Sequence, residues 1–331
     1  MMHRRTFLKT VAGSSAALIG ASAKRADAES APETKRIRLT NRPSICEAPQ
    51  YVAEELLQGE GFKDIQYVKR GTAASEGLLT SGEADISMLF GPPMILRIDA
   101  GEPLVFLAGV HIGCAEVFAT ERVRTVSDLK GKKVTIEAFR DVFHVFVASM
   151  AAHVGLNPEK DINWVIAPYA DYPEMLAAGK IDAFLAGPPM VQEMRARKIG
   201  HVIVNMLTDR PYYQYYCCML VGNRDFVRRY PVATKRAMRA ILRASELCAL
   251  QPERVARFLI DKGYVERSDY AVQAMREVVY GKWREYDTAD TVRFYSLRLH
   301  EAGLIKSSPQ RILSQGTDWR FLNELKKELK G

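Results

Sequence analysis

The sequence predicts an α/β fold built from two similar lobes, and three observations support this prediction. Short apolar runs alternate with helical stretches of about a dozen residues between residues 35 and 221. One segment of this region recurs later in the same region, and the chain after Arg224 is helical in pattern. Strands that alternate with helices are typical of parallel, doubly wound sheets.

The composition places the chain among globular proteins. It has 331 residues, of which 26% are charged and 47% hydrophobic. These values exclude the disordered, collagen-like and coiled-coil classes. The length suggests two domains or one large one.

The first 28 residues have the order of an export signal. Arg4 and Arg5 precede a weakly apolar stretch at 11–23, and a small-x-small triplet ends at Ala28. The apolar stretch is too short to cross a bilayer of about 30 Å at about 1.5 Å per helical residue. The segment resembles a twin-arginine signal, which a receptor reads and which is not an anchor. An amphipathic N-terminal helix is the alternative.

The charge balance depends on this signal. The whole chain carries a net charge of +8, and a chain cleaved after Ala28 carries +4. No run of lysines and arginines accompanies that excess, so nucleic acid is excluded as a partner. Because no later segment is apolar and long enough to span a membrane, we expect the mature chain to be soluble and exported. A periplasmic location and a monomeric state are further expectations.

The predicted elements follow from the apolar periodicity. The predicted strands are 36–40, 65–68, 85–89, 104–110, 133–137, 163–166, 181–185 and 201–205. The predicted helices between them are 49–57, 73–81, 92–100, 141–154, 172–178 and 188–197. Pro231, Pro252 and Gly263 divide the helical region that follows, which ends in an amphipathic helix at 319–329.

The internal repeat relates residues 82–94 to residues 179–190. In each copy a helix ends at a glycine, Asp85 or Asp182 opens a short buried strand, and Gly-Pro-Pro starts the next helix. Proline suits a helix start because its missing N–H would have no partner there. Chance similarity of two strand–helix units is one explanation. The other is two similar lobes, at about 35–120 and 123–210, with a ligand between them.

The cysteines and histidines predict neither a disulfide framework nor a metal site. The five cysteines are few, irregularly spaced and without a Cys-x-x-Cys pair, and an exported chain leaves at least one of them unpaired. We interpret them as small buried residues, with Cys217 and Cys218 on opposite faces of a strand. A Cys46–Cys114 bridge stays open. Ligand-like spacing is also absent from His111, His144, His153 and His201.

Four stretches in order resemble a known family. They are APQYVAEE at 48–55, SGEADI at 81–86, TVSDLKGKKV at 125–134 and AGKIDA at 178–183. Together with the export signal and the repeat, they resemble the periplasmic solute-binding proteins of ABC importers for aliphatic sulfonates, taurine and nitrate. The thiamine-pyrimidine binding proteins are relatives of that group. The resemblance covers residues 36–259.

The resemblance implies a type II periplasmic binding protein fold, in which two hinge crossings join two α/β lobes. Lobe one would comprise residues 29–121 and 220–331, with the helical C-terminal part packed on it, and lobe two residues 122–219. The crossings would lie near 120–123 and 215–221. A ligand would be closed between the lobes.

Ligands of open α/β sheets bind outside the carboxyl ends of the strands, so the loops at those ends supply the candidate binding residues. The candidates are Arg42, Ser44, Glu47, Arg70, Thr72, Gly91, Phe139, Arg140, Asp141, Tyr169, Gly187, Tyr212 and Tyr215.

Arg140 is the favoured ligand contact, because a guanidinium and the N–H groups of the following helix can converge on one oxyanion. A surface arginine, or one paired with Asp141, is the alternative. The family often has small or hydroxyl residues at this position, so the arginine puts the family's usual ligands in doubt. Glu47 is either a helix-entry acid or an amine contact. The tyrosines offer flat walls for an organic ligand.

The function expected from these features is capture of a small organic anion, such as a sulfonate, a taurine-like compound or a carboxylate, and its delivery to an ABC permease in the inner membrane. No cofactor is expected. A ligand-sensing module on a membrane receptor is one alternative, and a thiamine-pyrimidine binding or synthesising relative is another. The synthases carry a cysteine-rich run, of which this sequence has only Cys217-Cys218-Met219. The sequence has no hydrolase, zinc-protease or nucleotide-binding motif.

Overall fold

A computed structural model describes residues 29–69, 75–265 and 269–329, and the predicted export signal at 1–28 lies outside them. The fold is that of the unit Ala31–Gly331. None of the described helices is long and apolar enough to cross a membrane.

Five strands form two small neighbouring sheets. They are β1 (Arg36–Thr40), β2 (Asp64–Val68), β3 (Ile86–Phe90), β4 (Leu104–Ile112) and β10 (Tyr216–Asn223). β1 pairs with β2 in parallel, whereas β10 lies between β3 and β4 and runs antiparallel to both. The apolar runs that predicted four of these strands are therefore confirmed as strands.

A five-stranded sheet holds the middle of the chain, in the order β7-β6-β8-β5-β9. Its strands are β5 (Glu116–Ala119), β6 (Lys133–Ile136), β7 (Asn163–Ile166), β8 (Ala183–Ala186) and β9 (His201–Asn205). β6 is parallel to β7 and β8, as the alternating pattern predicts, but β5 is antiparallel to its neighbours. The chain therefore enters this sheet after Ile112 and leaves it after Asn205, earlier than the predicted crossings. The predicted lobe boundaries stay a prediction.

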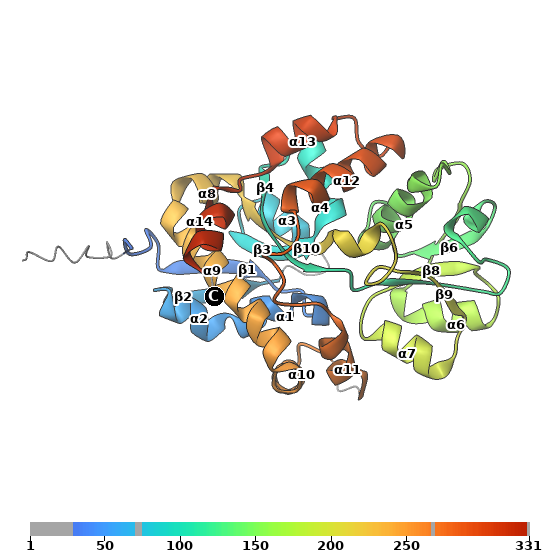
Figure 1. Cartoon of the computed structure of the whole chain (residues 1–331), viewed down its shortest axis with the longest axis horizontal. Helices are drawn as coiled ribbons and strands as arrows, with labels where there is room; N and C mark the ends of the chain where they lie inside the picture. Colours follow the sequence, from blue (N-terminus) through green and yellow to red (C-terminus); the bar gives the residue numbers. More distant parts are fainter. Residues whose placement is uncertain (1–28, 70–74, 266–268, 330–331) are drawn as a thin grey trace, which may run out of the picture. The chain divides into compact units, whose positions relative to one another are not determined.

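Helices flank both groups of strands (Figure 1). They are α1 (Ala48–Val52), α2 (Glu54–Gly59), α3 (Ser75–Thr80), α4 (Gly91–Asp99), α5 (Val142–His153), α6 (Tyr172–Ala177), α7 (Met190–Arg197), α8 (Arg224–Arg229), α9 (Pro231–Leu250), α10 (Pro252–Asp261), α11 (Asp269–Glu277), α12 (Thr288–Glu301), α13 (Pro309–Gly316) and α14 (Arg320–Glu328). Short 3-10 turns are η1 (Ile45–Glu47), η2 (Val126–Leu129), η3 (Tyr169–Asp171) and η4 (Tyr212–Gln214).

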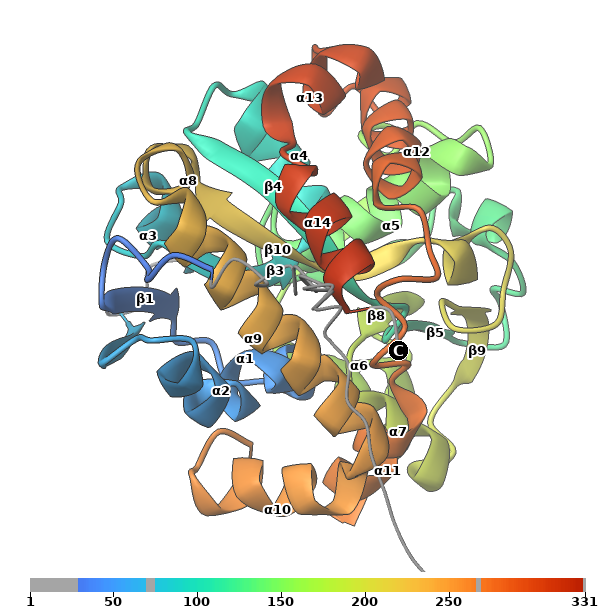
Figure 2. The same ribbon diagram turned by 60° about the vertical axis from the view of Figure 1, so that its left-hand side comes forward.

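The helical C-terminal region is confirmed, and it packs on the first group of strands. α9 contacts α1, α2, α14 and β4, and Figure 2 shows it running across α1 and α2. α12 contacts both α4 and α5. Pro231 and Pro252 open their helices at the first position, where proline is tolerated best.

The two copies of the internal repeat have the same local geometry. The backbone N–H of Asp85 donates to the carbonyl of Arg38, and the N–H of Arg38 donates back to the Asp85 carboxylate, both at 2.8 Å. Asp182 and Lys133 make the same reciprocal pair at 2.8 and 2.9 Å. Asp85 thus ties β3 to β1 of the neighbouring sheet, and Asp182 ties β8 to β6 within the five-stranded sheet. This buried anchoring role explains why the repeat preserves an aspartate at this position.

The helix start of the repeat differs slightly between the copies. α4 begins directly at Gly91, as predicted, whereas α7 begins at Met190, one residue after the second proline of its copy.

Candidate functional site

A cavity of about 120 Å³ lies beyond the carboxyl ends of β1, β3 and β8. Residues from both groups of strands line it, together with one face of α5. They are Arg42, Ser44, Cys46, Phe90, Cys114, Ala115, Val142, Phe143, Phe146, Tyr169, Leu185, Gly187, Pro188 and Cys217. This is the place that the carboxyl-end rule selects.

Arg42 supplies the cavity's cationic side chain. It follows β1, and its backbone N–H donates to the Tyr51 hydroxyl at 2.8 Å. The guanidinium lies over the Phe90 ring at 4.8 Å, and its Nη1 is 3.8 Å from the Glu47 carboxylate. Glu47 is fully buried. The aromatic ring and the acid therefore hold the guanidinium at the cavity.

Ser44 and Tyr169 add polar groups from opposite sides. The Ser44 hydroxyl is buried and has no hydrogen-bond partner among the described residues, so it can donate to a ligand. The Tyr169 hydroxyl accepts from the Gly187 N–H at 2.9 Å, and its ring stacks on Phe143 at 4.6 Å. Burial raises the pKa of Tyr169, so this hydroxyl stays protonated. Tyr169 therefore fixes both the Gly187 loop and one wall.

The favoured contact of the sequence analysis, Arg140, lies outside this lining. Arg140 is exposed and has a positive φ of 70°, and its neighbour Phe139 is 57% exposed. The Asp141 carboxylate accepts N–H groups from Glu137, Ala138 and His144 at 2.7–3.0 Å. It shapes the loop and caps α5 without being paired to Arg140 in these bonds. The geometry thus favours Arg42 over Arg140, and the binding role of the 139–141 loop stays a prediction.

The remaining candidates are dispersed. Gly91 opens α4 beside Met219, and Tyr212 is buried near His153. Tyr215 stacks on Phe294 of α12 at 4.0 Å, so it packs against the helical region. Arg70 and Thr72 lie outside the described residues.

The thiols at the cavity are the feature that the sequence analysis missed. Cys114 Sγ lies 3.1 Å from Cys46 Sγ and 3.2 Å from Cys217 Sγ, and all three residues line the cavity. The prediction that Cys217 and Cys218 point to opposite faces is wrong. The pairing of β10 with β4 is irregular around Cys218, which lets both sulfurs approach Cys114. The only sequence signal for this cluster was that Cys46 lies in the loop that follows the strand β1.

Four potential metal ligands also come together. One ligand atom each of Cys46, His111, Cys114 and Cys218 lies within 4.8 Å of the others, and all four residues are buried. The spacing argument against a metal site fails here because the four residues come from separate elements.

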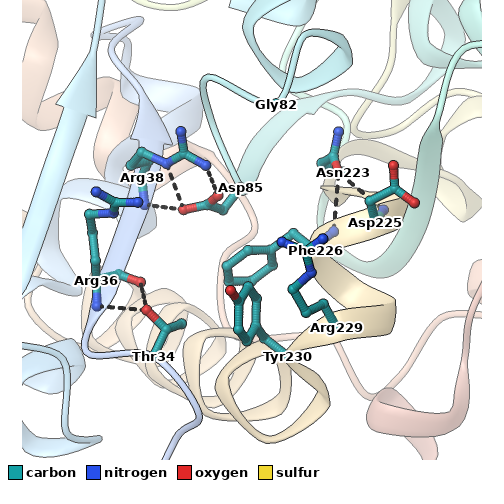
Figure 3. A pocket seen from close by; sticks show the side chains of 10 residues that line it. All are labelled: Thr34, Arg36, Arg38, Gly82, Asp85, Asn223, Asp225, Phe226, Arg229 and Tyr230. Carbon is teal, nitrogen blue, oxygen red and sulfur yellow. Dashed lines mark hydrogen bonds and ion pairs between the residues drawn. The ribbon is translucent and has the colours of Figure 1, made fainter.

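A second cavity of about 240 Å³ lies at the first half of β1, away from the carboxyl ends of β1 and β3 (Figure 3). Two of its charged groups, Arg38 and Asp85, are paired with each other. The Arg38 guanidinium holds the Asp85 carboxylate, and Asn223 caps α8 by accepting from two backbone N–H groups. The position and these bonds indicate a structural role.

The comparison with protein families decides the classification. The model of the NMT1-like family matches residues 30–259, more than half of the chain. The chain belongs to the NMT1-like family. The resemblance found in the sequence is thereby confirmed.

A curated relative of this NMT1-like chain is the nitrate import ATP-binding protein NrtC of Synechocystis sp.. The two are 26% identical over 306 residues, which cover 83% of this chain. The chain spans 45% of the length of that relative.

Solved structures share the fold of the NMT1-like chain. The periplasmic nitrate-binding protein NrtA from Synechocystis PCC 6803 superimposes with a TM-score of 0.73 at 16% identity, covering 91% of this chain and 90% of the other. The alkanesulfonate-binding protein SsuA from Xanthomonas axonopodis pv. citri, bound to MOPS, gives 0.67 at 15% identity, with 83% and 96% covered. The predicted periplasmic binding protein fold is confirmed.

Proposed function

We propose that this NMT1-like protein is the exported solute-binding component of an ABC importer. It captures a small organic anion, such as a sulfonate, a taurine-like compound or a carboxylate, and delivers it to a permease in the inner membrane. The observation that carries the proposal is the cavity at the strand ends, which holds Arg42, the Ser44 hydroxyl and an aromatic wall. The names of the nitrate- and sulfonate-binding neighbours support it.

The cavity's chemistry favours an anion with an apolar part. Arg42 offers a fork of N–H donors to a planar or tetrahedral oxyanion, and Ser44 adds a neutral donor. The stacked rings of Phe143 and Tyr169 form an apolar wall that can contact the apolar part of the solute. The volume of about 120 Å³ is below the range of about 300–1,000 Å³ for drug-sized ligands, so a small solute fits this conformation.

Binding would couple the two groups of strands. Arg42 and Ser44 come from the loop after β1, whereas Tyr169 and Gly187 come from loops of the five-stranded sheet. A solute that contacts both sets favours the conformation in which they are close. A permease could then distinguish the loaded protein from the free one.

The test is a thermal-shift screen of the chain starting at Glu29 against sulfonates, taurine, nitrate, bicarbonate, aromatic carboxylates and thiamine pyrimidines. A ligand at about 100 times its Kd adds about 2.7 kcal/mol, which corresponds to a shift of about 5 °C. We expect Arg42→Ala to remove the shift and Arg140→Ala, the matched arginine outside the cavity, to retain it.

The reverse pattern would move the site to the 139–141 loop. No shift with any of these solutes, in protein freed of bound ligand by unfolding and refolding, would reject the anion proposal.

A further inference from the structure

The buried thiols form a compact cluster that anion binding does not use. Cys46 lies in η1, Cys114 between β4 and β5, and Cys217 and Cys218 in β10, so four sulfurs converge from three segments. All four residues are at most 5% exposed. The fifth cysteine, Cys248 of α9, is equally buried but stands outside the group. Burial alone therefore does not account for the clustering.

The sulfur–sulfur distances in the cluster are slightly shorter than those of a tetrahedral metal site. About 2.3 Å between a tetrahedral ion and each sulfur places two sulfurs about 3.8 Å apart. Cys114 Sγ is 3.1 Å from Cys46 Sγ, so these two sulfurs would have to separate by about 0.7 Å to bind a tetrahedral ion. The four ligand atoms already lie within 4.8 Å of one another.

His111 lies where a fourth ligand would be needed. Its Nδ1 is 3.0 Å from the Ile112 carbonyl oxygen and its Nε2 is 2.9 Å from the Cys46 carbonyl oxygen. A neutral imidazole has one N–H, so it can donate to only one of these carbonyls. The other nitrogen then carries a lone pair that a metal ion can accept. An N–H donated to a backbone carbonyl is the usual outer contact of a metal-bound histidine.

We propose that Cys46, His111, Cys114 and Cys218 bind one thiolate-preferring d10 metal ion, either Zn(II) or Cu(I). Cys217, which lines the cavity beside Cys114, places this site against the solute cavity. Binding forms three metal–sulfur bonds and one metal–nitrogen bond and releases three thiol protons to solvent. No oxidation state changes. Softness of the sulfur ligands excludes Mg²⁺ and Ca²⁺.

The test is titration of the reduced chain from Glu29, under anaerobic conditions, with Co(II) as a spectroscopic substitute for Zn(II). We expect one equivalent to produce intense tetrahedral ligand-field bands and sulfur-to-cobalt charge-transfer bands, and Zn(II) to displace them. Competition with a chromophoric chelator measures Zn(II) and Cu(I) affinities in separate arms. Tight one-to-one binding of either ion supports the proposal.

Two cysteine variants and one control locate the site. Cys114→Ser and Cys218→Ser should each weaken binding at least 100-fold, whereas Cys248→Ser should leave it unchanged. Far-ultraviolet circular dichroism checks that each variant folds, and the anion shift measured in parallel separates this site from the proposed function. Binding that is absent, or equal in all variants, overturns the proposal. A mapped Cys46–Cys114 disulfide in protein purified without reductant also overturns it.

Discussion

Asp85 and Asp182 each bond the backbone of a neighbouring strand, but their arginine partners differ in exposure. Asp85 is paired with Arg38, which is 26% exposed, whereas the partner of Asp182, Arg122, is 64% exposed. Removing one partner of a more buried ion pair costs more, because the remaining charge is left with less water around it. The two anchors should therefore contribute unequally to stability.

We predict that Asp85→Asn lowers the free energy of unfolding by about 1–3 kcal/mol. Asparagine keeps an acceptor for the Arg38 N–H but loses the charge that pairs with its guanidinium. Asp182→Asn should cost less, and the exposed Asp64→Asn should stay within about 0.5 kcal/mol. Urea denaturation measures all three, and an equal loss at positions 85 and 182 would contradict the argument.

His144 makes stability depend on pH. Burial, followed by the charge of Arg140, lowers its pKa from 6.5 to about 4. Between these values the unfolded chain binds more protons than the folded one, so stability is complete above pH 6.5 and falls as the pH drops toward 4. The loss amounts to about 3 kcal/mol. Burial raises the pKa of Asp141, which opposes part of this loss.

The measurement is the unfolding free energy from pH 6.5 to pH 4, the range set by the two pKa values of His144. We predict a flatter profile for His144→Gln than for the wild type, because a glutamine at position 144 binds no proton in this range. Parallel profiles for the two proteins would show that other groups cause the acid sensitivity.

At the scale of elements, the chain's first passage between the two groups of strands leaves no room for a side chain. A Cβ on Gly113 would lie 2.3 Å from the carbonyl oxygen of Met206, which belongs to the return passage. Backbone meets backbone at this point, so neither segment can yield as a flexible side chain would. Glycine is required here by close approach.

We predict that Gly113→Ala destabilises the protein by about 2–3 kcal/mol, because the two passages must separate. A methyl group added at Gly77 of α3 would meet no atom within 4 Å, so Gly77→Ala is the control and should be neutral or stabilising by up to about 1 kcal/mol. Thermal unfolding compares the two variants. A tolerated Gly113→Ala would mean that the passages move apart readily.

The order of strands and loops accounts for how much of the cavity could be predicted from the sequence. Apolar runs locate strand ends, so the rule for parallel sheets selected Arg42, Ser44, Tyr169 and Gly187 correctly as neighbours of one cavity. It could not rank Arg42 above Arg140, because the positive φ and the backbone bonds that direct that loop outward are not visible in sequence.

The thiol cluster could not be predicted from local sequence patterns. It depends on which loops meet and on an irregular pairing at Cys218. The short strand β5 was missed because its apolar run is only three residues long, Val117–Ala119, between Glu116 and Thr120.

At the scale of the whole molecule, the helical C-terminal region contributes residues to the main hydrophobic core. Trp283 is fully buried, its indole N–H donates to Glu246 of α9 at 3.1 Å, and its backbone carbonyl accepts the Tyr216 hydroxyl at 2.8 Å. Trp283, which lies outside the residues 30–259 matched by the family model, thus joins α9 to β10, the strand that follows the five-stranded sheet in the chain. The C-terminal region is part of the fold's core.

We predict that Trp283→Ala lowers the free energy of unfolding by about 3–5 kcal/mol while the protein still unfolds in one transition. Leu250→Ala, at a side chain that is 76% exposed, should change it by less than about 0.5 kcal/mol. Circular dichroism and tryptophan emission in urea provide two probes. Separate transitions from the two probes would show that the C-terminal region unfolds independently.

The contact between His144 and Trp164 has an optical consequence. The two rings lie 4.7 Å apart, and His144 belongs to the same helix as Val142 and Phe143 of the cavity wall. A nearby imidazole quenches indole fluorescence, more strongly when protonated, so any shift of α5 alters the emission of Trp164. The protein therefore carries its own reporter beside the cavity. A solute that shifts α5 on binding would therefore change the tryptophan emission without any added label.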